Sequence, residues 1–217
     1  MLTVHHLEHS RSFRILWAME ELGLEYTIKL YKRLASQAAP PELKKIHALG
    51  KAPILTTDEE TIAESAVILE FLQDEFDSEH KFKPQDKKAL RQYQYWMHYA
   101  EGSLMPYLVM TLVVNSVPNR APFLIRPVAK KIVGGIKAGF LKPRIKEHIQ
   151  YLESYLSQHE YFAGDAFSFA DVQMGFPLIA MQERVGGEHP NIDAFIERMK
   201  VRPAYLRAMI REQNLEK

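Results

Sequence analysis

The 217-residue sequence contains no cysteine. This absence excludes disulfides, thiolate metal ligands and redox chemistry at a protein thiol. A charge excess of one sign is also lacking, and the net charge of +1 argues against a dedicated nucleic-acid binder. No apolar run approaches the length of a membrane span, and Met1 leads into a strand-like pattern rather than a signal peptide. We therefore expect a cytoplasmic protein with no integral membrane association and no nucleic-acid partner.

The first 77 residues have the pattern of a compact α/β domain. A helix is expected between two strands, because Ile15, Leu16, Met19 and Leu22 have the spacing of one helical face and Gly23 can end it. The expected order is β-α-β, an irregular connection with one helical turn after Pro40-Pro41, and then β-β-α. The segments concerned are 2–7, 15–22, 26–31, 54–57, 61–63 and a helix from Glu64-Ser65.

The remainder of the chain, after a polar linker at 77–85, has helical patterns throughout. We expect an all-α domain over 86–217, following an α/β domain over 1–77. The expected helical regions are 89–112 with a bend at Pro106, 123–156 interrupted by Gly134-Gly135 and Pro143, 168–183, and 191–210 divided near Arg202-Pro203.

The stretch from Gly50 to Phe71 is expected to hold a small acidic peptide. If the Ala52–Pro53 bond is cis, it turns the backbone N–H and C=O of Ala52 toward a peptide-like ligand. Ser65 stands where a helix N-cap belongs, beside free backbone N–H groups and the positive end of the helix dipole. Such a helix start is a seat for a carboxylate.

Four segments together resemble the cytosolic glutathione transferases, most closely a branch found in fungi and bacteria. They are HHLEHSRSFRILW, ALGKAPIL, AESAVILEFL and GDAFSFADVQMGFP, and they match in order and spacing across nearly the whole chain. The resemblance implies a thioredoxin-like α/β amino-terminal domain, an all-helical carboxy-terminal domain and a homodimer.

The same resemblance implies roles for individual residues around glutathione. The backbone of Ala52, before a cis Pro53, would pair with the cysteinyl part, and Lys51 would lie near the glycyl carboxylate. Glu64 and Ser65 would hold the γ-glutamyl end. The hydroxyl that activates the thiol would be Ser10, with Ser12 as second choice, because relatives of the serine type place it several residues before a helical arginine, here Arg14.

The implied activity is conjugation of glutathione, as co-substrate, to small hydrophobic electrophiles, with glutathione-dependent peroxidase activity as a further possibility. The alternative is a non-catalytic binding or regulatory protein of the same fold. Tyr99, Met105 and Tyr107 are expected to form the electrophile site under the aromatic helix. The competing interpretation of Tyr93, Trp96 and Tyr99 is that an aromatic stripe at helical spacing belongs to the core.

Three further features invite other interpretations. The histidines His5, His6 and His9 lack accompanying ligands, so we expect no metal site. Ser168 and Asp171 have the spacing of a capping box rather than of a catalytic pair. The stretch 102–146 has no acidic residue and eight basic ones. It can form a solvated basic face or a positive rim that attracts anionic glutathione. A third interpretation is attachment to an acidic membrane surface.

Overall fold

A four-stranded mixed sheet carries the amino-terminal part of the computed structural model, which describes residues 1–215. The strands lie in the order β2-β1-β3-β4. β2 runs parallel to β1 because helix α1 connects them, whereas β3 and β4 are antiparallel additions. The bounds are β1 (Thr3–Leu7), α1 (Phe13–Leu22), β2 (Thr27–Tyr31), a 3₁₀ turn (Pro41–Lys45), β3 (Ile54–Thr56), β4 (Thr61–Ala63) and α2 (Ser65–Phe76). This thioredoxin-like arrangement confirms the expected fold class.

The pleat of β1 sends alternate side chains to opposite faces of the sheet. Val4 joins the main hydrophobic core with residues of α1 and α2. Leu7 instead joins a smaller cluster with Tyr31, Leu43 and Ile54, in which Leu43 belongs to the 3₁₀ turn. The turn that follows the strand, residues 8–12, therefore begins between the main core and the smaller cluster.

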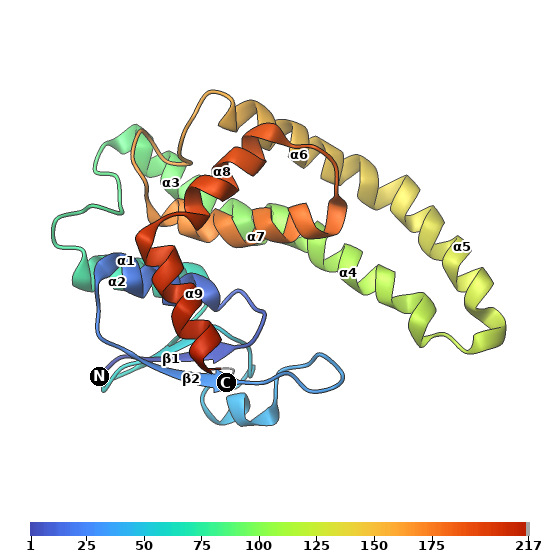
Figure 1. Ribbon diagram of the computed structural model, residues 1–217, viewed down its shortest axis with the longest axis horizontal. Coiled ribbons are helices and arrows are strands. Elements are labelled where there is room, and N and C mark those ends of the chain that lie inside the picture. The colour runs from blue at the N-terminus through green and yellow to red at the C-terminus, as the bar shows by residue number, and fades with distance from the viewer. Residues whose placement is uncertain (216–217) are drawn as a thin grey trace.

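Helices make up most of the described chain beyond residue 86 (Figure 1). They are α3 (Lys87–Tyr99), α4 (Met105–Arg120), α5 (Arg126–Ile136), α6 (Lys142–Leu156), α7 (Phe169–Val185), α8 (Pro190–Lys200) and α9 (Pro203–Leu215). The expected division of the last region near Arg202-Pro203 is confirmed. This part is mostly helical, as the sequence predicted.

Two wide π-helical turns change the expected course of the long helices. Ala100–Leu104 forms one between α3 and α4, so Pro106 stands in the first turn of α4, where its missing N–H is tolerated. Lys137–Leu141 forms the other, and Pro143 follows it in the same position of α6. The predicted interruption at Gly134-Gly135 was wrong, because α5 continues through both glycines and the wide turn comes after them.

The two parts of the chain share one core. The ring centres of Trp17 in α1 and Tyr205 in α9 lie 5.1 Å apart. The Trp17 ring also packs against Gly175 of α7, where a Cβ would come within 3.1 Å of it. Figure 1 shows α9 crossing over the amino-terminal part so that its last turns lie beside the sheet. The carboxy-terminal helix therefore contributes to the structure around the first strand.

The start of α7 is fixed by the predicted capping box, which the structure confirms. The Asp171 carboxylate accepts the Ser168 backbone N–H at 2.8 Å and the Phe162 backbone N–H at 2.8 Å. The Ser168 hydroxyl donates to the same carboxylate at 3.0 Å. Asp171 is fully buried, so this carboxylate joins the 162–168 loop to the helix.

Candidate active site

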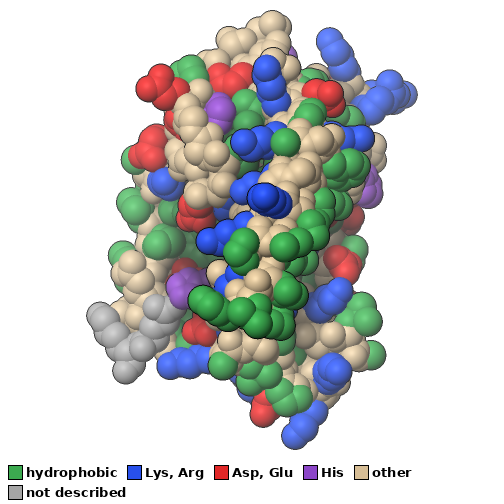
Figure 2. Space-filling model, turned by 90° about the vertical axis from the view of Figure 1, so that its right-hand side faces the viewer, with side chains coloured by type: hydrophobic (Ala, Val, Ile, Leu, Met, Phe, Trp, Pro, Cys, Tyr) green, Lys and Arg blue, Asp and Glu red, His purple; other side chains and the backbone are tan. Residues whose placement is uncertain are grey.

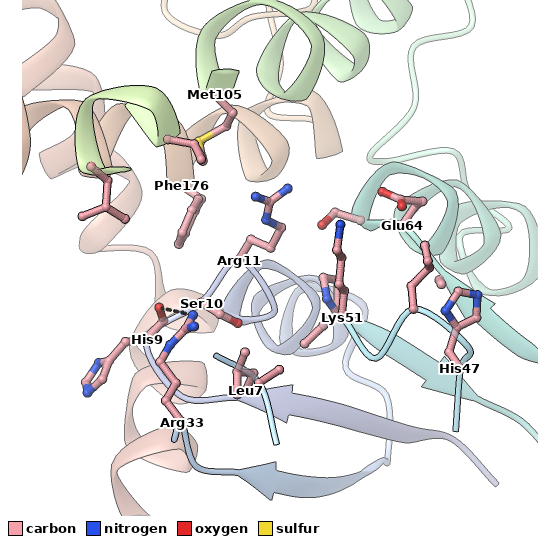
Figure 3. A pocket seen from close by; sticks show the side chains of 18 of the residues that line it. Leu7, His9, Ser10, Arg11, Arg33, His47, Lys51, Glu64, Met105 and Phe176 are labelled. Carbon is pink, nitrogen blue, oxygen red and sulfur yellow. Dashed lines mark hydrogen bonds between the residues drawn. The ribbon is translucent and has the colours of Figure 1, made fainter. Parts of the chain in front are cut away.

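A cavity of about 500 Å³ opens between the end of β1 and the helical part (Figure 3). The amino-terminal side contributes polar groups and the helical side contributes Met105, Val109, Leu112 and Phe176. The polar and backbone lining comes from His9, Ser10, Arg11, Arg33, His47, Lys51, Ala52, Pro53, Glu64, Ser65 and Arg184. One wall can thus bind a polar ligand while the other accepts apolar atoms.

Of the two predicted serines, Ser10 is the one that lines the cavity. Its Oγ lies 2.7 Å from the Oγ of Ser12 and accepts the Ser12 backbone N–H at 3.2 Å. Ser12 is fully buried, and its Oγ also lies 2.8 Å from Nδ1 of His6. A molecule in the cavity can therefore meet the hydroxyl of Ser10 but not that of Ser12.

The bond between Ala52 and Pro53 is cis, as expected, and both residues line the cavity. Gly50, with a φ of 58°, precedes this segment, and a Cβ at Gly50 would come within 2.6 Å of Cγ of Lys44. A left-handed conformation with so close a neighbour requires glycine. Gly50 therefore helps to set the path of the chain into residues 51–53.

The start of α2 faces the same cavity. The expected N-cap position of Ser65 was wrong by one residue, because Ser65 is the first helical residue and Glu64 is the N-cap. The helix start has no side-chain cap, and the Oγ of Ser65 is buried without a hydrogen-bond partner. This end of the helix thus keeps donors available for an anion.

Glu64 is exposed and has a φ of 74° and a ψ of 126°. For a residue other than glycine, this conformation costs roughly 1–3 kcal/mol. Such strained residues gather at binding sites, where the surrounding structure holds them in place. The backbone at Glu64 is therefore a second sign that this corner is built for a ligand.

Charge at the cavity is mainly positive and comes from the predicted Lys51 and from three arginines that were not predicted as site residues. Arg11, Arg33 and Arg184 line it together with Lys51, against the single carboxylate of Glu64 among the lining residues. The Arg33 side chain connects the turn after β1 to the loop after β2, donating to the backbone carbonyls of Glu8 and Gln37. The only sequence signal for Arg33 was its place two residues after a strand, and no local sequence feature indicated Arg184.

Arg11 is held beside the cavity by Glu101, which also binds Arg14 at 2.6 Å. Arg14 is fully buried, and it donates to the side chain of Gln173 at 2.6 Å as well. Burial lowers the pKa of Arg14 to about 10, although Glu101 opposes this change. The guanidinium stays charged at neutral pH and ties the turn after β1 to the helical part.

The aromatic residues predicted for the electrophile site lie elsewhere. Tyr99 is buried, and its hydroxyl contacts Nδ1 of His148 at 2.5 Å. Tyr107 packs against the ring of the same histidine, and neither tyrosine lines the cavity. Met105, the third predicted residue, does line the cavity, from the first turn of α4 and on the same helix face as Val109 and Leu112. Tyr99 is a core residue, as the competing interpretation held.

The acid-free stretch 102–146 forms much of an arm, made by α4 and α5, that projects away from the sheet (Figure 1). None of its eight basic residues lines the cavity. On the face from which the arm projects, Figure 2 shows Lys and Arg side chains running beside a gathering of hydrophobic ones. The predicted positive rim at 102–146 therefore does not lie at the cavity, whose lining cations are Arg11, Arg33, Lys51 and Arg184.

Within residues 1–215, no group of three or more histidine or acidic side chains is arranged to hold a metal ion. The same part of the chain has no helix that is long and apolar enough to cross a membrane.

The comparisons with known proteins agree with this geometry. The family model "Glutathione S-transferase, N-terminal domain" matches residues 1–74, and the corresponding "C-terminal domain" model matches residues 139–203. Glutathione S-transferase 3 of Schizosaccharomyces pombe is 38% identical over 94% of this chain and 85% of its own length. Glutathione S-transferase 1 of Saccharomyces cerevisiae is 38% identical over 85% of this chain and 82% of its own length.

Solved structures give the same result. A glutathione S-transferase from Actinobacillus pleuropneumoniae superposes with a TM-score of 0.83 and 31% identity, covering 98% of this chain and 93% of that one. A glutathione transferase from Phanerochaete chrysosporium, solved with oxidised glutathione, has a TM-score of 0.78 at 19% identity, covering 99% and 96%. The second likeness shows a shared fold.

Proposed function

The chain belongs to the glutathione S-transferase family of enzymes, and from this premise we propose that it joins glutathione to small hydrophobic electrophiles with Ser10 as the thiol-activating group. The glutathione thiolate would add to the electrophile or displace a leaving group from it. The observation that carries the proposal is the cavity, which brings the Ser10 hydroxyl, the Ala52 backbone and the start of α2 to one surface opposite an apolar wall.

The proposed position of glutathione follows the donors and charges of the cavity. The γ-glutamyl carboxylate would take the start of α2, where Ser65 Oγ is buried without a partner, and its amino group would pair with Glu64. The cysteinyl backbone would bind Ala52, and Lys51 would stand near the glycyl carboxylate. The sulfur would then lie by Ser10, facing the apolar wall that includes Met105 and Phe176 (Figure 3). We also expect a homodimer, which light scattering of the purified protein would test.

A hydroxyl that donates to the sulfur favours the thiolate and lowers the pKa of the thiol, which is about 8.5 when free. One hydrogen bond to a charged group contributes about 1.5–3 kcal/mol, which corresponds to one or two pKa units. A two-unit fall raises the thiolate fraction at neutral pH roughly 25-fold, but the intrinsic nucleophilicity falls nearly tenfold. Most of the acceleration must then come from holding the electrophile against the sulfur.

Ser10→Ala is therefore expected to lower kcat with an aryl halide about threefold at neutral pH, and by more at lower pH, while glutathione still binds. Steady-state kinetics across pH would measure this, with the exposed Ser36→Ala as the matched control. A rate equal to wild type at and below neutral pH would remove Ser10 from its proposed role. Absence of any turnover by the wild type with aryl halides and hydroperoxides would favour the non-catalytic alternative.

Glu64→Gly is expected to raise the melting temperature by a few degrees, because glycine relieves roughly 1 kcal/mol of backbone strain. The same change should weaken glutathione binding, since the ligand loses a carboxylate partner. Differential scanning calorimetry and titration calorimetry would measure the two effects. Gln37→Gly is the matched control, because Gln37 is also left-handed, with a φ of 67°, but lies outside the cavity. It should gain stability and keep its affinity, and a Glu64→Gly variant that binds like wild type would contradict the assigned role.

A further inference from the structure

Ser10 is the outer end of a line of short contacts that runs from the cavity into the protein. Its Oγ lies 2.7 Å from Ser12 Oγ, which lies 2.8 Å from Nδ1 of His6. Nε2 of His6 lies 2.9 Å from Oε1 of Glu212, on α9. Ser12 and His6 are fully buried, and the Glu212 side chain is 17% exposed. The reaction proposed above assigns no role to Ser12, His6 or Glu212.

We infer that Ser12, His6 and Glu212 form a relay that takes the thiol proton of glutathione from Ser10 and then holds Ser10 as a donor to the thiolate. The inference rests on the proposed function, because it concerns the same sulfur and the same hydroxyl. Ser12, His6 and Glu212 do not line the cavity, so they act as positioning and proton-accepting residues behind Ser10.

Backbone groups restrict how the two hydroxyls can point. The Leu7 N–H donates to Ser12 Oγ at 3.1 Å, and the Ser12 N–H donates to Ser10 Oγ at 3.2 Å. Each hydroxyl then has its own proton to donate and one further position at which to accept. The Ser12 hydroxyl can also reach the Leu7 carbonyl, at 3.3 Å, but its contact with Nδ1 of His6 is shorter, at 2.8 Å. Along the shorter contacts, both protons point inward toward His6 or both point outward toward the cavity. Nδ1 of His6 decides between the two, since it accepts when bare and donates when protonated.

The two directions are the states before and after one proton transfer. In the inward state Ser10 presents a lone pair to the cavity and can accept the thiol S–H. The S–H bond then breaks and leaves its electron pair on sulfur. The thiol proton moves to Ser10 Oγ, the Ser10 proton moves to Ser12 Oγ, and the Ser12 proton moves to His6. The N–H bond that forms is at Nδ1 of His6, and in the resulting outward state Ser10 donates to the thiolate. No other reactant enters, and the protons balance.

Glu212 makes the charged state of His6 tolerable. A buried imidazolium needs an opposite charge, and the carboxylate at 2.9 Å supplies it. The two atoms are within ion-pair distance, but they are not aligned as a hydrogen bond. Glu212 therefore stabilises protonated His6 mainly through its charge. The nearby titratable Tyr205 stays protonated, because burial and then the charge of Glu212 raise its pKa to about 12.

Other charges on the elements around this line are already paired. On α9, both Arg207 and Arg211 bind Glu20 of α1. On β1, the ring of His5 points away from the line, with Nδ1 2.9 Å from the Tyr31 hydroxyl and Nε2 3.2 Å from Oγ1 of Thr56. His5 is thus a buried histidine on the same strand but outside the relay, and it serves as the matched control.

The test reads the ultraviolet absorbance of the thiolate of bound glutathione as a function of pH, which needs no electrophile. In His6→Asn and Glu212→Gln, the pKa of the bound thiol should rise by about one, whereas His5→Asn should match the wild type. The value of kcat with an aryl halide should fall about three- to fourfold well below the pKa of the thiol and change little at neutral pH. Above that pKa it should exceed the wild-type value about threefold, because the less acidic thiol gives the stronger nucleophile. KM for glutathione should stay within about twofold, because the relay residues do not touch the ligand.

Each other result decides against the relay. If wild type lowers the thiol pKa and both relay variants lower it equally, the relay is wrong and the proposed function stands. If wild type does not lower it at all, the proposed function fails first and the relay fails with it. A His6→Asn protein that does not fold leaves the decision to Glu212→Gln, whose side chain lies at the partly exposed end of the line.

Discussion

Ser65→Ala is expected to weaken glutathione binding roughly 10- to 150-fold, the equivalent of one hydrogen bond to a charged group. Ser65 is 3% exposed, and its Oγ is a buried polar atom without a partner beside the cavity. A carboxylate at the start of α2 would supply that partner, and the helix dipole adds to the attraction. Titration calorimetry with glutathione would measure the loss directly.

The matched control for this prediction is Ser168→Ala, which also removes a buried serine hydroxyl at the beginning of a helix. It should cost roughly 1 kcal/mol of stability but leave the affinity for glutathione unchanged. Equal affinities for wild type and Ser65→Ala would place the ligand's carboxylate somewhere else. The proposed position along residues 51–65 would then be wrong.

Asp171→Ala is expected to lower the free energy of unfolding by roughly 3 kcal/mol or more. The substitution leaves the backbone N–H groups of Phe162 and Ser168 and the Ser168 hydroxyl without their acceptor in a buried place. Urea or thermal unfolding would measure the loss. Asp165→Ala, an exposed carboxylate in the same loop, should change stability by no more than about 0.5 kcal/mol.

The pH dependence of this loss has a definite sign. Burial raises the pKa of Asp171 from 3.8 to about 6, so between these values the folded protein holds a proton that the unfolded chain releases. The stability that this proton contributes is complete below pH 3.8 and is lost as the pH rises through 6. The cost of Asp171→Ala should therefore be larger at pH 4 than at pH 7, by roughly 3 kcal/mol at most. A cost that grows with rising pH would contradict this assignment.

Features that depend on neighbouring residues could be predicted from the sequence. Gly23 ends α1 with a left-handed φ of 65°, and Pro203 begins α9. Ser168 and Asp171 form their capping box because the spacing of three residues suffices. The cis bond before Pro53 and the position of Ser10 at the cavity agree with what the family resemblance implies.

Features that depend on helix phase or on distant contacts could not be predicted. The wide turn at 100–104 breaks the phase between α3 and α4, so the periodicity of one continuous helix could not show which face of α4 meets the cavity. The Arg184 side chain reaches the cavity from the end of α7, and Glu212 meets His6 across nearly the whole chain. Neither pairing leaves a pattern in the local sequence, because each arises from how the helices pack on the sheet.

The most direct measurement is a crystal structure of the protein with glutathione. We expect the tripeptide to lie along residues 51–65, with its γ-glutamyl carboxylate at the start of α2, its cysteinyl backbone paired with Ala52, and its sulfur about 3–3.5 Å from Ser10 Oγ. A glutathione whose carboxylate avoids the start of α2, or whose sulfur points away from Ser10, would contradict the proposed site and the chemistry assigned to it.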